Sequence, residues 1–239
     1  MEIKYLGHSC FFITSKDGLR IVTDPYSKVI KYNLPEIEAD IIIQSHSHYD
    51  HNAVSRIMGA PKVVSGTQKH NVEYELNFPE INQTITFKGI LSYHDVSAGK
   101  NKGTSTIFLW TLDNIRFCFL GDIGCLPDEN IIRQIGKVDV LFIPVGGVST
   151  INSSEASMLI NRLTPLAVFP MHYNTPVIDN LKIADESLDD FLSKVNSKKI
   201  IDSSVFAFDA ITLPINTTVF AFENQKTEDR SQKTDTDEI

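Results

Sequence analysis

The segment from Gln44 to Asn52 constrains this chain more than any other. It follows the apolar run Ile41–Ile43, which is typical of a buried strand, and its metal-binding side chains are His46, His48, Asp50 and His51. Histidines two residues apart in an extended segment project to the same side, whereas Asp50 and His51 point elsewhere in the turn. The loop can therefore supply two imidazoles to one metal ion, and a carboxylate and an imidazole to a second.

A helical zinc site would instead use histidines four residues apart, which stack on one face. The alternative for this segment is a polar loop that happens to be rich in histidine. That alternative fits poorly, because three of the seven histidines fall here beside an aspartate, and buried polar groups would need partners. A single short motif stays a hypothesis until further ligands occur at suitable places.

Length and charge limit the kinds of protein that this chain can be. At 239 residues it can form one large domain or two small ones. Its net charge of −8 argues against nonspecific nucleic-acid binding, which uses clustered lysine and arginine, so we expect no nucleic-acid partner. No apolar stretch approaches the roughly 18 residues that span a membrane, and no secretory signal is visible.

The cysteines, Cys10, Cys118 and Cys125, are odd in number and form no CxxC motif. That pattern suits free thiols in a reducing compartment. We therefore expect a cytoplasmic protein with a small-molecule substrate and no membrane partner, and homo-oligomerisation stays open.

Short apolar runs separated by turn residues predict the strands. The first three, with the turn signal Asp17-Gly18 between the second and third, predict an antiparallel meander. The predicted strands are Ile3–Leu6, Cys10–Thr14, Leu19–Thr23, Ile41–Gln44, Lys62–Val64, Thr84–Phe87, Ile90–Tyr93, Thr104–Leu112, Ile115–Leu120, Val138–Val145 and Leu166–Pro170, with further strands between Lys199 and Phe222.

The predicted helices are Asn52–Met58, Pro127–Ile135, a helix from Ser153 or Ser154 to Leu163, and Ser187–Val195. Asn52 and one of the two serines can cap their helices. The polar segment 28–40 predicts a loop over the site. From Glu223 onward the chain is almost without apolar residues and cannot offset chain entropy. We therefore expect one α/β domain with two sheets over residues 1–222, and a disordered polar tail over 223–239.

Three further residues fit the missing ligand positions. His94, Asp122 and His172 each lie just past an apolar strand, where loops gather at one edge of a sheet and rigid elements fix side chains. Alone, such a histidine is more often a hydrogen-bonded structural residue, and such an aspartate a turn residue. Their joint occurrence with the histidine loop predicts a dinuclear metal site.

The run His46-Ser47-His48-Tyr49-Asp50-His51, followed by His94, Asp122 and His172, resembles the metallo-β-lactamase superfamily. Further matches, Leu6-Gly7-His8-Ser9, Asp24-Pro25, and His94-Asp95 followed by Gly103, resemble its metal-dependent hydrolases related to ascorbate-6-phosphate lactonase and N-acylphosphatidylethanolamine phospholipase D. The resemblance covers residues 1 to about 222. It implies a four-layer αββα sandwich, with two mixed β-sheets, helices outside and the site at one edge of the sheets.

The resemblance also implies a ligand set. The first metal would be held by His46, His48 and His94, and the second by Asp50, His51 and His172, with Asp122 as the bridge. Mixed imidazole and carboxylate ligands suit zinc, and also manganese or iron, so we expect two Zn2+ with Mn2+ or Fe2+ as alternatives. Related di-iron flavoproteins carry a glutamate where His48 stands, and a flavin domain for which this chain has no room.

Residues beside the ligands have both a functional and a structural interpretation. Asp24 can fix the tautomer of a ligand histidine or act as a turn residue, and His8 can line the site or cap the first loop. We expect His70 on the surface. Cys125 is an unfavoured ligand, because Asp122 already fills that position.

Residues that follow ligands can also face the substrate. Lys100 and Lys102 come after His94 and can attract a phosphate or carboxylate, or they are solvated loop lysines. Tyr173 and Asn174 follow His172 and can line the substrate site.

Together these expectations describe a dinuclear hydrolase. A bridging hydroxide would attack a small lactone, ester or phosphoester, and Asp50 would orient it and later protonate the leaving group. No GxSxG motif or paired Cys/His nucleophile is evident. The alternatives are a phosphodiesterase or nuclease of the same superfamily, and a metal-binding protein without catalysis.

Overall fold

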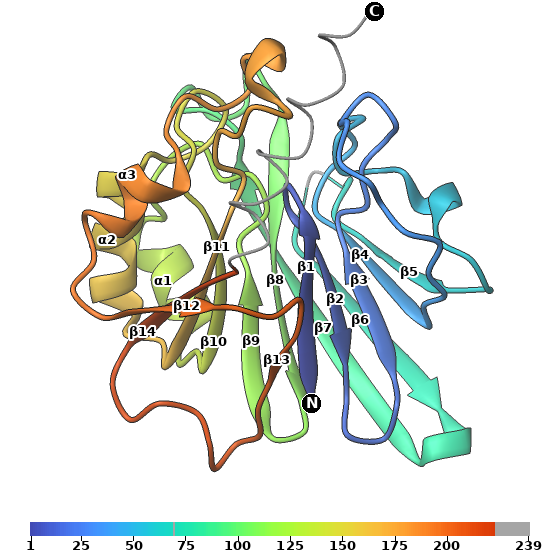
Figure 1. Ribbon diagram of the computed structural model, residues 1–239. Coiled ribbons are helices and arrows are strands. Elements are labelled where there is room, and N and C mark those ends of the chain that lie inside the picture. The colour runs from blue at the N-terminus through green and yellow to red at the C-terminus, as the bar shows by residue number, and fades with distance from the viewer. Residues whose placement is uncertain (69, 223–239) are drawn as a thin grey trace, which may run out of the picture.

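The computed structural model describes residues 1–68 and 70–222, and the predicted tail over 223–239 lies outside them. The described chain forms two β-sheets that pack face to face, with α-helices against one of them (Figure 1). Both sheets contain parallel and antiparallel pairs, so the predicted sandwich of two mixed sheets is confirmed.

The smaller sheet contains six strands in the order β13-β1-β2-β3-β4-β5 within the described residues. Their bounds are β1 Glu2–Gly7, β2 Cys10–Thr14, β3 Arg20–Thr23, β4 Ile41–Gln44, β5 Lys62–Ser65 and β13 Phe206–Ala207. Strands β1 to β3 pair antiparallel, as predicted for the meander, whereas β3, β4 and β5 pair parallel. Strands β1, β3 and β4 therefore run in one direction and end at the same edge.

The larger sheet has the order β12-β14-β11-β10-β9-β8-β7-β6. Its strands are β6 Val72–Phe78, β7 Gln83–Tyr93, β8 Thr104–Leu112, β9 Ile115–Phe119, β10 Val140–Pro144, β11 Ala167–Met171, β12 Lys198–Ile201 and β14 Thr218–Phe222. Strands β6 to β9 pair antiparallel, and β9, β10, β11, β14 and β12 pair parallel. Strands β7, β9 and β11 therefore end at one edge as well.

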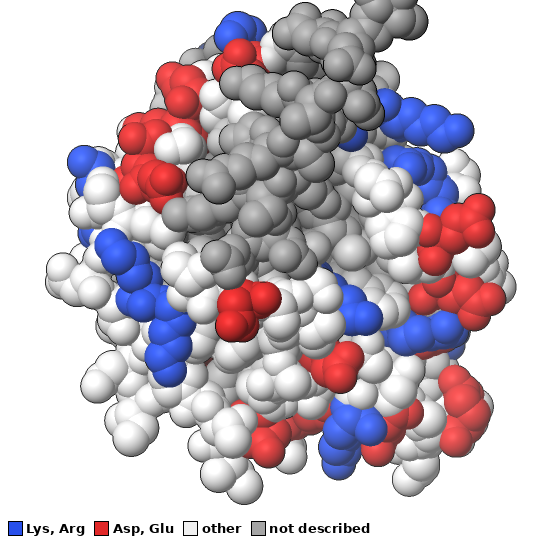
Figure 2. Space-filling view, viewed as in Figure 1, with Lys and Arg blue, Asp and Glu red and all other residues white. Residues whose placement is uncertain are grey.

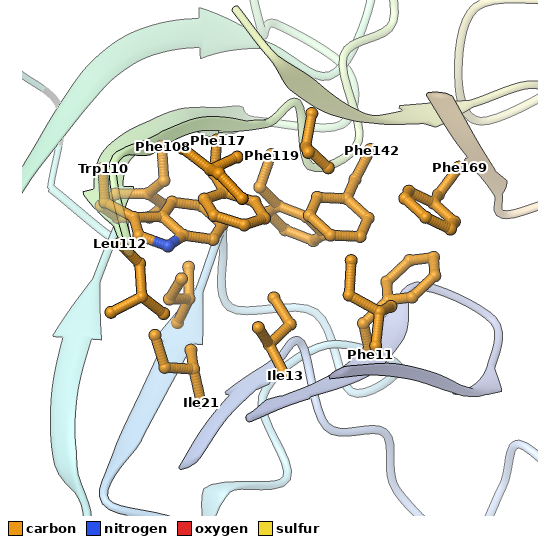
Figure 3. Packing of buried hydrophobic residues seen from close by; sticks show 14 of the residues in the cluster. Phe11, Ile13, Ile21, Phe108, Trp110, Leu112, Phe117, Phe119, Phe142 and Phe169 are labelled. Atoms are coloured by element: carbon orange, nitrogen blue, oxygen red, sulfur yellow. The ribbon is translucent and has the colours of Figure 1, made fainter. Parts of the chain in front are cut away.

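The main apolar core lies between the sheets, because successive side chains of a strand face opposite sides. On β4, Ile41 and Ile43 point into this core and Ile42 points outward. Figure 3 shows a row of aromatic rings from the larger sheet, Trp110, Phe117, Phe119, Phe142 and Phe169. Trp110 and Phe117 stack with centroids 5.1 Å apart, and Phe142 and Phe169 stack with centroids 5.5 Å apart. This close-packed core fixes the strands, and therefore the loops at their ends.

The two outer faces are covered differently. Helices α1 Glu129–Ile135, α2 Ser153–Leu163 and α3 Leu188–Leu192 pack on the larger sheet (Figure 1). The smaller sheet is covered by apolar residues of the segment 26–39 and by 3₁₀ turns. The helical layer predicted outside the sheets is thus found over the larger sheet, and most of the predicted loop 28–40 packs on the smaller one. No helix in the described part of the chain is long and apolar enough to cross a bilayer.

The structure corrects several local predictions. The predicted helix Asn52–Met58 is only a 3₁₀ turn, Val54–Arg56, and Asn52 does not cap it. The amide of Asn52 instead donates to the Ser47 carbonyl, which holds it in the histidine loop. Helix α2 is capped by Asn152, which forms a capping box with Glu155, rather than by a serine.

Strand predictions between residues 72 and 93 also need correction. The two predicted runs Thr84–Phe87 and Ile90–Tyr93 form the single strand β7, because pairing with β6 reaches Gly89 and pairing with β8 continues across it. Strand β6 was not predicted, although Val72, Tyr74 and Leu76 alternate with polar residues, which is the signal of a half-buried strand.

Candidate metal centre

The predicted ligands all lie at the edge where these strands end, at the top of Figure 1. His8 follows β1, Asp24 follows β3, the histidine loop follows β4, His94 follows β7, Asp122 follows β9 and His172 follows β11. Because the sheets pack face to face, loops from both converge at this edge. Residues that are distant in sequence therefore form one cluster.

His46, His48 and His94 form the first group, with one ligand atom of each lying within 4.8 Å of the others. His46 Nε2 faces His48 Nδ1 at 3.0 Å. His46 and His94 are 3% exposed, whereas His48 is half-buried. The group can bind one metal ion, and it opens to solvent on the side of His48.

Asp50, His51 and His172 form the second group together with His8, again with ligand atoms within 4.8 Å. All four residues are buried. The Oδ2 atom of Asp50 lies 3.5 Å from His51 Nε2. The rings of His51 and His172 stack with centroids 5.7 Å apart.

Asp122 lies between the two groups. Its Oδ2 atom is 3.1 Å from His51 Nε2, 3.0 Å from His172 Nε2 and 3.4 Å from His94 Nε2. His46 Nε2 is 4.0 Å away. One carboxylate oxygen thus faces nitrogens of both groups, as a bridging ligand must.

Asp24 connects a histidine of each group through Ser45. The Oδ2 atom of Asp24 accepts from Ser45 Oγ at 2.5 Å and from His51 Nδ1 at 2.8 Å, and Oδ1 accepts from the Ser45 backbone amide at 2.7 Å. Ser45 Oγ in turn lies 2.9 Å from His46 Nδ1. Since Ser45 donates to the carboxylate, it accepts from His46 Nδ1–H. Both histidines therefore keep a proton on Nδ1, which leaves Nε2 as the ring atom available to a metal ion.

Charges within the cluster control its protonation. Burial alone would raise the pKa of Asp122, but the neighbouring His172 and His51 hold it well below its usual range. Burial alone would lower the pKa of His51, but the carboxylates of Asp122, Asp50 and Asp24 raise it well above its ordinary value. An excess of negative charge thus surrounds His51, and a bound cation would complement it.

The buried polar atoms test whether a metal fits here. Among the described residues, those without a hydrogen-bond partner include His51 Nε2, His94 Nδ1, Asp122 Oδ1 and both ring nitrogens of His172. Buried polar atoms are almost always satisfied, so their concentration at one place indicates an absent partner. Imidazole and carboxylate donors are the ligands that Zn2+ and similar ions bind in proteins. The residues therefore fit a two-metal centre.

Comparison with known proteins gives the family of the chain. A family model described as the β-lactamase superfamily domain matches residues 2–172. The chain belongs to this superfamily. The resemblance found in the sequence is confirmed, and the matched part contains all the predicted ligands, from His46 to His172.

Members of the superfamily resemble the chain over most of its length. A protein of Pyrobaculum neutrophilum named metal-dependent hydrolase is 30% identical over 194 residues, which cover 73% of this chain and 85% of that protein. One of Pyrobaculum islandicum with the same name is 28% identical over 82% of this chain and 92% of that protein.

A crystal structure from Thermotoga maritima, assigned to the Zn-dependent hydrolases of the metallo-β-lactamase superfamily, superposes with a TM-score of 0.72. It is 28% identical, and the match covers 92% of this chain and 97% of that one.

A glycine allows the loop after β10 to pack closely against His172. A Cβ atom on Gly146 would lie 2.0 Å from the carbonyl oxygen of His172, closer than any side chain tolerates. Gly146 and Ser45 are site-supporting residues that sequence reasoning missed. A glycine after an apolar strand indicates only a turn, and the contact partner appears only in the fold.

The loop that follows His94 is held by Asp95, whose carboxylate accepts four backbone amides, those of Ser97, Gly99, Asn101 and Lys102. The Nζ atom of Lys102 donates to the Val148 carbonyl at 2.6 Å and contacts Ser149 Oγ at 3.2 Å. Lys102 thus links two loops beside the site, whereas Lys100 is exposed.

The other predicted residues lie as follows. Tyr173 is 2% exposed and packs beside Tyr5, so it supports the segment before His8 rather than facing solvent. Asn174 donates to Asp179. His70 is exposed, as predicted, and Cys125 is a half-buried free thiol outside the ligand groups found in the described chain.

Proposed function

We propose that this chain, a metal-dependent hydrolase of the metallo-β-lactamase superfamily, is a dinuclear enzyme that hydrolyses a small lactone, ester or phosphoester. The position of Asp122 carries the proposal. Its Oδ2 atom lies within 3.4 Å of Nε2 atoms of His51, His94 and His172, which come from three different strand ends. A cluster of buried ligands from separate strand ends is better explained by the binding of two metal ions than by a purely structural role.

We assign His46, His48 and His94 to one metal and Asp50, His51 and His172 to the other, with Asp122 shared. Zinc is the simplest occupant, because the ligand chemistry suits it and the Thermotoga maritima relative is assigned to Zn-dependent hydrolases. When bound, such a pair supplies a water-derived nucleophile at neutral pH and neutralises charge that develops on the substrate oxygen.

The side chains of the site have distinct tasks in this reaction. Asp24 and Ser45 hold His51 and His46 in the tautomer that directs Nε2 inward. Asp50 is the carboxylate that orients the attacking water and returns a proton to the leaving group. Burial of the ligands, apart from His48, limits the entry of bulk water to one side.

The open side of the site favours a small substrate with an anionic group. His48 is half-buried, and its ring lies 4.9 Å from that of His94. Lys100 is exposed in the loop after His94, and its ammonium can attract a carboxylate or phosphate. Basic and acidic side chains intermingle on the face shown in Figure 2, and the net charge is −8. This distribution favours a small molecule over a nucleic acid. The free cysteines support a cytoplasmic location.

Metal analysis combined with a substrate panel tests the proposal. The purified protein should hold two metal ions per chain and hydrolyse lactones, esters or phosphodiesters. Asp122→Ala should lower metal affinity and turnover by at least about 100-fold, because removing a shared ligand affects both metals and even supporting residues contribute 10–100-fold.

Asp139→Asn is the matched control. Asp139 is a buried aspartate just before β10, at the edge opposite the ligands, and it accepts from the Arg116 amide at 2.9 Å. It should retain both metals and full activity. Full activity of Asp122→Ala would refute the shared ligand. Two bound metals without turnover would favour a non-catalytic protein, and turnover of phosphodiesters alone would favour a phosphodiesterase.

A further inference from the structure

His8 is a buried histidine that the ligand assignment above leaves without a task. Its side chain is fully buried, and its Nε2 atom lies 3.2 Å from Asp50 Oδ2. The ring packs between two ligands, with centroids 4.2 Å from His172 and 4.9 Å from His51. His8 therefore contacts the second group of ligands, Asp50, His51 and His172, which we call the second half-site.

The backbone around His8 is held in an uncommon conformation. His8 has φ 55°, and Gly7 before it has φ 104°. A Cβ atom on Gly7 would lie 2.8 Å from Cγ of Tyr32, so only glycine fits beneath this ring. A non-glycine residue in the left-handed region is strained, and such strain persists only where surrounding contacts impose it.

Several hydrogen bonds impose this conformation. The His8 carbonyl accepts from Tyr5 Oη at 2.7 Å and from the His172 backbone amide at 2.9 Å. The Leu6 carbonyl accepts from Tyr26 Oη at 2.5 Å. The segment is therefore fixed to the same strand end that carries His172, and the imidazole has little freedom to move.

One tautomer explains the polar contacts of His8. An ionised carboxylate only accepts hydrogen bonds, so the 3.2 Å contact requires a proton on His8 Nε2. The neutral ring then has a bare Nδ1, and this atom has no hydrogen-bond partner in the described structure. The oxygen that receives the hydrogen bond, Asp50 Oδ2, is also the one that lies 3.5 Å from His51 Nε2. His8 thus fixes the carboxylate oxygen that faces the other ligands of this group.

We propose that His8 is a positioning residue that donates a hydrogen bond to Asp50 and thereby sets the affinity of the second half-site for its metal. The inference rests on the proposed two-metal function. Supporting residues of this kind contribute roughly 10–100-fold to metal affinity. Among the described residues, no hydrogen bond, ion pair or ring contact joins His8 to His46, His48 or His94, so this first half-site should be insensitive to it.

Two variants separate hydrogen bonding from packing. His8→Leu keeps a buried side chain but removes the donor, whereas His8→Gln places an amide N–H at a similar reach. Zinc is titrated into each protein against a competing chelator, and bound metal is counted by elemental analysis. His70→Gln is the control, because His70 is exposed and belongs to none of the ligand groups found in the described chain.

The wild-type protein should bind two equivalents of zinc. His8→Leu should bind the first equivalent normally and the second at least about 10-fold more weakly, while His8→Gln should restore the second to within a few-fold. Circular dichroism on each sample establishes that it is folded.

Three outcomes would count against the inference. Unchanged binding of both equivalents by His8→Leu would overturn the positioning role. Equal loss in His8→Gln and His8→Leu would show that the imidazole itself is needed and overturn the donor role. A wild-type protein that holds fewer than two metals would instead overturn the proposed function, and the inference with it.

Discussion

Replacement of Asp24 by asparagine should weaken both half-sites at once. Asp24 is fully buried and receives three hydrogen bonds, two from Ser45 and one from His51 Nδ1. In Asp24→Asn the amide oxygen can still accept from the Ser45 backbone amide. The amide nitrogen then replaces Oδ2 and donates where the carboxylate accepted.

This reversal changes the tautomers of two ligands. His51 Nδ1 must accept from the new amide, so its proton moves to Nε2, the atom that faces Asp122. Ser45 Oγ must also accept from the amide, and it then donates to His46 Nδ1, which moves the proton of His46 to Nε2 as well. A protonated Nε2 cannot bind a metal. The backbone is not the cause, because asparagine tolerates the φ of 33° at this position.

The expected magnitude follows from these contacts. Loss of one supporting residue lowers metal affinity by about 10–100-fold, which is about 1.4–2.7 kcal/mol of binding free energy, and here each half-site is affected. In the metal-free protein, forcing buried donors and acceptors into new pairs should lower the free energy of unfolding by about 1–3 kcal/mol.

Chelator competition gives the two affinities, and urea unfolding with and without zinc separates stability from binding. Asp139→Asn is again the control, because it alters a buried carboxylate far from the ligands and should change stability without changing zinc affinity. Wild-type affinity for both equivalents in Asp24→Asn would refute the argument from tautomers.

Two other substitutions test how the loops are held. Gly146→Ala places a methyl group 2.0 Å from the His172 carbonyl oxygen. We therefore expect the free energy of unfolding in urea to fall by about 1–3 kcal/mol, and one zinc ion to bind more weakly. An unchanged free energy of unfolding together with unchanged zinc affinity would contradict the contact. Asp95 has a pKa below its usual range, because the amide of Lys102 and other backbone amides donate to it. A carboxyl group whose pKa is lower in the folded than in the unfolded protein stabilises the folded state at pH values above its unfolded pKa of about 3.9. This stabilisation is lost as the pH falls through the folded pKa. Asp95→Asn should therefore be less stable than wild type near neutral pH, and the difference in unfolding free energy should shrink below about pH 4; a constant difference would contradict this.

Local patterns predicted much of the fold. The apolar runs that became β2, β4 and β8 were predicted residue by residue, because burial and strand period are both properties of neighbouring residues. The helix expected after Asn52 failed, since tertiary contacts of that loop outweigh a weak helical preference. These include the bond from the Ala53 amide to the Pro25 carbonyl.

The sequence by itself determined which side chains could bind metal. His46, His48, Asp50 and His51 share one loop, and ligand chemistry does not depend on the fold. The sequence could not determine which distant residues support these ligands, because strand pairing brings together segments whose contacts leave no local pattern in the sequence. Only the tertiary structure placed Ser45 between Asp24 and His46, and only the meeting of the β1 and β11 ends brought His8 against the second half-site. Those supporting contacts depend on distances between chain segments, which only the packed sheets fix.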